Sequence, residues 1–203
     1  PLRVRLFKKL KIKHELFAQA LDACGIGEYW SNDGTDTAFG SHNNAFSWNW
    51  KSICYAAPPR EVAAKAARHA IHAVRTAKED EAVAILFVGE KKGNWEHLST
   101  APECATLGTF SEGAVEEPCG WDTERTDQKK PRRTLKVCIF GNQKGFETLK
   151  GEAHSWSGVF EEALGEHAEY FTPELRSPGV RGKAWTRLRS YKDTGAPEPK
   201  VQV

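Results

Sequence analysis

The sequence predicts an α/β fold built on a mostly parallel sheet, and two observations favour it. The apolar run 51–56 stops at the double proline Pro58-Pro59, and an alanine-rich helical pattern extends from 61 to 77. Proline cannot donate to a sheet ladder, whereas its missing N–H costs nothing in the first turn of a helix. The next apolar run, 82–88, is continuous, as expected of a parallel strand covered on both faces. Such a strand–helix–strand unit is typical of three-layer α/β domains.

The elements before this unit are short. We expect a basic arm at 1–11, a strand at 12–18, and a second short strand that starts at Glu28 after a glycine-rich turn. Residues 31–49 are rich in Gly, Asn, Ser and Asp, which indicates a loop. The globular α/β domain is therefore expected to begin near residue 12.

After the unit we expect a short helix near Trp95 and then two more strands, 104–110 and 135–140. A polar, acidic loop at 111–133 joins these strands without a helical pattern, so they are predicted to pair antiparallel and to close the sheet. Apolar residues at helical spacing in 155–169 favour an amphipathic helix. The domain is thus expected to span 12–169, and 170–203 to be a basic tail that is extended or disordered.

Charge is unevenly placed along the 203 residues, although the net charge is only +2. Basic residues without acidic neighbours gather at 1–13 and 176–192. Basic segments with interleaved aromatics suit a phosphate backbone and stacked bases, and a solubilising surface is the alternative. The candidate residues of the second segment are Arg181, Lys183, Trp185, Arg187 and Arg189.

The five cysteines, at 24, 54, 104, 119 and 138, show no C-x-x-C spacing. Cys54 and Cys138 lie in apolar strand-like runs, where cysteine is usually a small buried hydrophobe. We therefore expect neither disulfides nor a metal site, and we interpret the protein as intracellular, nuclear or cytoplasmic. The pair His69 and His72 has helical spacing for a metal site but lacks a third ligand, so no metal is expected.

Short motifs in a fixed order give the chain a family resemblance. They are Glu15-Leu16-Phe17-Ala18, Trp50, Tyr55-Ala56-Ala57-Pro58-Pro59, Ile85-Leu86-Phe87-Val88 and Trp95. In this order they resemble the S-adenosylmethionine-dependent N6-adenine methyltransferases of phage and cap-adenosine type, and most closely the related domains found in retroelements. The resemblance covers about half of the chain and implies a Rossmann-like, three-layer fold of methyltransferase type.

The same resemblance points to a degenerate active site. In active members an Asn or Asp precedes the two prolines and accepts from the adenine amino group, and an aromatic residue follows and stacks on the flipped base. Here these positions hold Ala57 and Arg60, around Pro58 and Pro59. Arginine can stack its guanidinium plane but does not have the shape of Tyr or Phe. We therefore assign no catalytic residue in this degenerate motif.

The remaining candidate residues concern cofactor and nucleic-acid contacts. The glycine-rich turn that holds the cofactor in this family is missing after Phe17, and Glu15, Asp33 and Asp36 are the remaining candidates for S-adenosylmethionine. Arg60 and the pair Lys91-Lys92 are expected at the carboxyl ends of strands, where an open α/β sheet binds ligands. Three tryptophans flank that edge and serve either core filling or base stacking; they are Trp48, Trp50 and Trp95.

The sequence accordingly predicts a non-catalytic, methyltransferase-like module without a cofactor. It begins with proline and contains no methionine, which indicates a segment of a longer protein. Its expected partners are nucleic acid, DNA or RNA, and protein subunits of a larger assembly, and no membrane is expected because no long apolar stretch occurs. Two alternatives stay open: an active N6-adenine methyltransferase that uses S-adenosylmethionine, and a purely structural protein-interaction domain.

Overall fold

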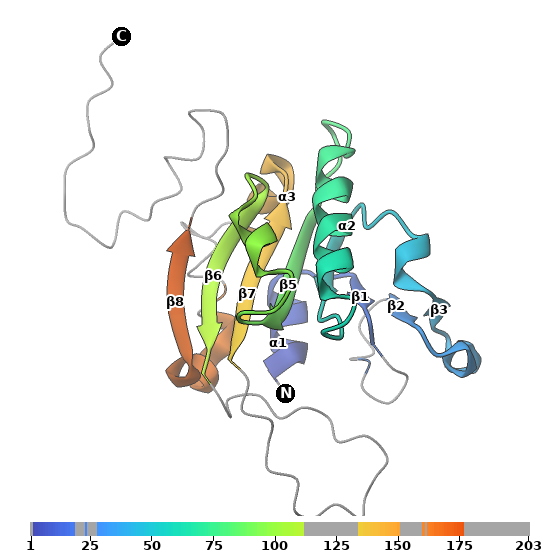
Figure 1. The fold of residues 1–203 in the computed structure, drawn as a ribbon, viewed down its shortest axis with the longest axis horizontal. Coiled ribbons are helices and arrows are strands. Elements are labelled where there is room, and N and C mark those ends of the chain that lie inside the picture. Colours follow the sequence, from blue (N-terminus) through green and yellow to red (C-terminus); the bar gives the residue numbers. More distant parts are fainter. Residues whose placement is uncertain are drawn as a thin grey trace, which may run out of the picture.

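A single eight-stranded sheet organises the computed structural model, in the order β3-β2-β1-β4-β5-β7-β6-β8 (Figure 1). The structure describes residues 2–18, 23, 28–111, 134–150, 160 and 162–176. The strands are β1 (His14–Leu16), β2 (Glu28–Ser31), β3 (His42–Asn43), β4 (Ile53–Ala56), β5 (Ala84–Glu90), β6 (Cys104–Phe110), β7 (Leu135–Gly141) and β8 (Phe171–Arg176).

The strand directions match the predicted fold class. β3, β2, β1, β4 and β5 run parallel, and β7 lies antiparallel between β5 and β6. The expected antiparallel pair, β6 and β7, therefore closes a parallel sheet, and the α/β class with a Rossmann-like arrangement is confirmed. The predicted strand 51–56 and helix 61–77 appear as β4 and α2 (Ala63–Arg75).

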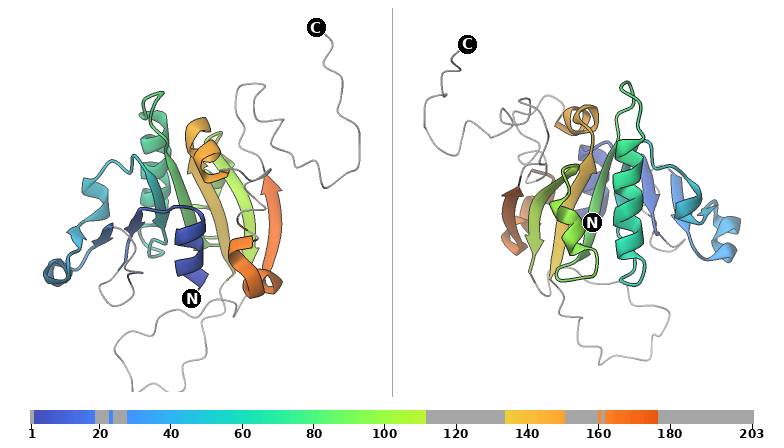
Figure 2. Two further views of the ribbon diagram at one scale, coloured as in Figure 1. Left: turned by 180° about the vertical axis from the view of Figure 1, so that it is seen from behind. Right: turned by 45° about the horizontal axis from the view of Figure 1, so that its top comes forward.

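Helices cover both faces of the sheet and make three layers (Figure 2). Helix α2 and the 3-10 segment η3 (Glu96–Thr100) cover one face; α1 (Leu2–Lys9), α3 (Gln143–Lys150) and η4 (Gly165–Tyr170) cover the other. Two 3-10 segments, η1 (Gly34–Phe39) and η2 (Ala45–Ser47), interrupt the expected loop 31–49. Among the described residues no helix has the length and apolar character needed to cross a membrane.

Small side chains let α2 lie close to the sheet. Its buried face is mostly alanine, with Ile71 and Val74 near its C-terminal end. Opposite it lie the three described cysteines, Cys54, Cys104 and Cys138, all of them buried. Burial of Cys54 and Cys138 agrees with the expected role of small hydrophobes. On the same face the indole of Trp95 is fully buried beside Gly89, and it fixes the start of η3 to β5.

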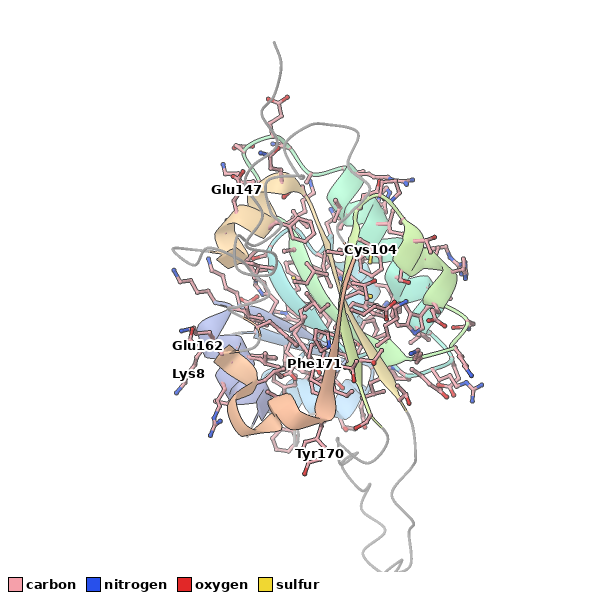
Figure 3. The ribbon with its side chains drawn as sticks, turned by 90° about the vertical axis from the view of Figure 1, so that its left-hand side faces the viewer. Lys8, Cys104, Glu147, Glu162, Tyr170 and Phe171 are labelled. Atoms are coloured by element: carbon pink, nitrogen blue, oxygen red, sulfur yellow. The ribbon has the colours of Figure 1, made fainter. Side chains whose placement is uncertain are left out.

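We expected residues 1–11 to form a basic arm outside the domain. This prediction is wrong, because Leu2–Lys9 form helix α1. Leu6, Phe7 and Leu10 are buried in the core, and the ring centroid of Phe7 lies 5.1 Å from that of Tyr55. The apolar stripe thus decides the structure, while Lys8 and Lys9 stay exposed. Figure 3 shows Lys8 and Glu162 at the same corner of the molecule. There the Nζ of Lys9 lies 2.5 Å from a carboxylate oxygen of Glu162.

The predicted boundary near residue 170 is also wrong, since the sheet continues to residue 176. Strand β8 pairs antiparallel with β6 and places Phe171 in the core. Pro173 lies within the predicted tail 170–203 and inside β8, where a proline is tolerated because the strand is at the edge of the sheet. Of the predicted helix 155–169, residues 162–164 are helical and η4 follows. Residues 151–159 and 177–203 lie outside the described part.

Candidate functional site

The carboxyl edge of the parallel strands carries the motif residues. Strand β4 ends at Ala56, and Ala57, Pro58 and Pro59 turn the chain toward α2, which begins at Ala63. Pro58 is buried and Ala57 is half-buried. The predicted corner between a central strand and the following helix is therefore confirmed. In open α/β sheets this edge is where ligands bind.

Arg60 bridges the ends of two neighbouring strands. Its Nε lies 3.6 Å from Oε2 of Glu90, the last residue of β5, and its side chain is 64% exposed. The exposed Lys91 and Lys92 follow directly, and the backbone N–H of Lys92 donates to Glu96 Oε2 at 2.8 Å. Arg60, Lys91 and Lys92 thus share one exposed edge, formed by the ends of β4 and β5.

Glu15 is the second of the three residues of β1, one position before the end of that strand. In β1 it pairs in register with Tyr29 of β2 and Tyr55 of β4, so the three side chains share a face of the sheet. Tyr55 on that face packs against Phe7 of α1. Glu15 is 3% exposed, so its carboxyl is buried on the face of the sheet where Tyr55 meets α1.

The aspartates after β2 do lie at the carboxyl edge, but each is engaged within its own loop. Asp33 Oδ1 accepts from the N–H of Thr35 at 2.9 Å and from its hydroxyl at 2.7 Å. The side-chain hydrogen bond from Thr35 is the main cause that lowers the pKa of Asp33. Asp36 is buried, and its Oδ2 accepts from the hydroxyl of Ser31 at 2.6 Å. Both carboxylates therefore shape the turn into η1.

Aromatic side chains fill the space beyond the end of β1. Phe17 has φ 64°, a left-handed conformation that is unusual for a bulky residue, and its ring meets Phe46 and Trp50 at 5.3 and 5.8 Å between centroids. Trp50 is fully buried, and its Nε1 donates to the carbonyl of Ala45 at 2.7 Å. His69 of α2 packs on Trp50 at 4.5 Å. A packed aromatic cluster thus follows directly after the end of β1.

The tryptophans mostly fill the core. Trp50 and Trp95 are both 0% exposed, which excludes base stacking in this conformation. Trp48 is half-buried and stacks on Trp30, with 4.4 Å between the centroids and 9° between the planes. These tryptophans therefore fill the core, which is one of the two roles expected for them.

The two histidines of α2, His69 and His72, have different surroundings. The Nε2 of His69 lies 2.8 Å from the carbonyl oxygen of Trp48, whereas His72 is exposed. Within the described ranges no group of three potential metal ligands occurs. The predicted basic segment with Arg181, Lys183, Trp185, Arg187 and Arg189 lies outside the described residues.

The sequence reasoning missed a groove between α2 and η3, of about 540 Å³. Arg68, His72 and Arg75 line it from α2, and His97 lines it from η3. The spacing i, i+4, i+7 on α2 was a visible signal, because it places these side chains on one helix face. The contribution of η3 depends on tertiary packing, and no local pattern reveals it.

Comparisons with known proteins leave the family undetermined. The scan against models of protein families finds no match, and neither does the search of curated proteins.

Proposed function

We propose that this chain is a methyltransferase-like module that does not transfer methyl groups and that binds nucleic acid within a larger protein or complex. The topology supports the first part, because an antiparallel pair closes a parallel sheet and the double proline ends a central strand. The charge and exposure of the carboxyl edge support the second.

The observation that carries the proposal is Ala57. It stands at the end of β4, where the resemblance requires an Asn or Asp that accepts from the adenine amino group. A methyl side chain cannot accept a hydrogen bond. Loss of one positioned transition-state hydrogen bond typically costs about 10²–10³ in rate. The following position holds Arg60, which reaches toward Glu90 in place of an aromatic ring for the base.

The surroundings of β1 and β2 favour a module without S-adenosylmethionine. Phe17 stands where a glycine turn would approach the cofactor, and its ring is packed against Phe46 and Trp50. The carboxylates of Asp33 and Asp36 already accept hydrogen bonds from their own loop. These contacts give both carboxylates a structural role in the loop that needs no cofactor.

Nucleic-acid binding is supported by the exposed cations of the same edge. Arg60, Lys91 and Lys92 lie together at the ends of β4 and β5, and only Glu90 and Glu96 approach them among the described residues. Cations so placed suit phosphate contacts, which need no specific base. DNA and RNA are equally compatible with this surface.

A thermal-shift titration with S-adenosylmethionine tests the proposal. A ligand at a hundred times its dissociation constant stabilises by about 2.7 kcal/mol, which is roughly 5–11 °C for a chain of this size. We expect no shift. A clear upward shift that is reduced in Asp33→Asn would instead assign the active-enzyme alternative. Fluorescence anisotropy with a labelled oligonucleotide tests the second part, and absence of binding at low salt would leave the protein-interaction alternative.

A further inference from the structure

The groove between α2 and η3 lies on a helix-covered face, apart from the carboxyl edge. Its volume of about 540 Å³ falls within the range of ligand sites, roughly 300–1,000 Å³. Arg68, His72, Arg75 and His97 are all exposed, so the groove is open to solvent along its walls. Half-buried Leu98 and exposed Pro102 contribute apolar surface to the same groove.

Arginine and histidine side chains converge here from two separate elements. Arg68, His72 and Arg75 form a row about 10 Å long on α2, at a rise of about 1.5 Å per residue. His97 faces this row from η3. The chain as a whole has a net charge of only +2, so this concentration of basic groups does not follow from general basicity.

One carboxylate beside the groove, that of Glu103, pairs with Arg75 at the end of the row. Glu103 accepts from Arg75 Nε at 2.7 Å and from its Nη2 at 3.3 Å. This hydrogen bonding is the main cause that raises the pKa of Arg75, so its charge is retained. Arg68 forms no ion pair within the described part of the chain and is available to a ligand. Basic residues at the C-terminal end of α2 also interact favourably with the helix dipole. His97 belongs to another element and has no such role.

We propose that this groove binds the phosphate backbone of a single-stranded nucleic acid. Two arginines and a histidine spread along about 10 Å of helix suit an extended polyanion better than a single phosphate, and the apolar surface beside the row suits sugar and base contacts. The inference rests on the proposed nucleic-acid function and adds a second strand-binding surface to it. The groove is separate from the carboxyl edge that carries Arg60, Lys91 and Lys92.

Anisotropy titrations of the full chain with a labelled single strand, repeated at several salt concentrations, test this assignment. Arg68→Gln removes one exposed charge and should weaken binding roughly tenfold at low salt. It should also reduce the slope of log K against log salt by about 0.7, the release expected for one phosphate contact with a single strand. Lys78→Gln removes an exposed charge just beyond α2 and should change affinity less than about twofold, because Lys78 does not line the groove.

The outcomes separate the two proposals. If the intact chain binds the strand while Arg68→Gln and the double variant Arg68→Gln/His97→Gln bind equally well, the groove assignment is wrong and the function stands. If the intact chain binds no strand, the proposed function itself is wrong. Binding of a phosphoserine peptide in place of the strand, lost in Arg68→Gln, would assign the groove to a phosphoprotein and overturn the nucleic-acid assignment. Unchanged circular dichroism spectra establish that each variant is folded.

Discussion

Substitution of Gly89 by alanine tests how η3 is attached to the sheet. A Cβ at this position would lie 2.5 Å from both Cε2 and Nε1 of Trp95, well inside ordinary contact. Trp95 cannot retreat cheaply, because it is 0% exposed and its Nε1 donates to the carbonyl of Glu90 at 3.0 Å. Overpacking costs about 1–3 kcal/mol, and a buried donor left unpaired costs about 1–3 kcal/mol more.

We therefore expect Gly89→Ala to lower the free energy of unfolding by about 3 kcal/mol, which is a fall of roughly 6–12 °C in the melting temperature. Gly34→Ala is the matched control, because no atom lies within 4 Å of its added Cβ. Its effect should stay within about 0.5 kcal/mol. Urea denaturation followed by circular dichroism measures both changes.

Equal stability of the two glycine variants would refute this reasoning. A double-mutant cycle with Trp95→Phe is sharper, since phenylalanine lacks the pyrrole atoms that crowd position 89. The combined variant should lose less stability than the sum of the single losses, by more than about 0.5 kcal/mol. If the losses simply add, contact with Trp95 is not the cause.

Two further predictions concern buried aromatic packing. Burial is the main cause that lowers the pKa of His14, although Glu28 at 3.5 Å opposes it. The contribution of neutral His14 to stability is complete above about pH 6.5, the ordinary pKa of histidine. It is lost as the pH falls below that value, because the unfolded chain takes up the proton first. Urea midpoints between about pH 7.5 and 5 should therefore fall less steeply in His14→Gln than in wild type, and parallel curves would contradict this. Trp50→Ala should cost about 3–5 kcal/mol in the same assay, whereas Phe39→Ala, at a side chain 73% exposed, should change stability by less than about 0.5 kcal/mol; similar losses would contradict the assigned packing.

The central unit of the fold was predictable because local chemistry and tertiary structure agree there. Pro58-Pro59 ends β4 whatever surrounds it, and the alanine pattern forms α2. Helix α1 was not predicted, because the many lysines and arginines of this segment suggested an exposed arm. The buried stripe of Leu6, Phe7 and Leu10 instead holds it on the sheet. Strand β8 was missed because Pro173 suggests a break, and only its place at the edge of the sheet makes proline acceptable there.

The candidate site was predictable only where a motif fixed its position. The motif placed Ala57 and Arg60 at the carboxyl edge, and the structure has them there. The same resemblance could not tell that Glu15 faces α1, since this depends on the register of β1 with its neighbours. The groove joins residues of α2 to residues of η3, and packing around Trp95 brings them together.

The two rims of the sheet bear on how copies of this domain behave at high concentration. A strand with a free row of N–H and C=O groups is a template for β-aggregation. Within the described residues one rim is β3, which is only two residues long, and the other is β8, which contains Pro173. Neither offers a long, regular row of donors to an incoming strand. The described rims of the sheet are therefore poor templates for edge-to-edge pairing between copies of this domain.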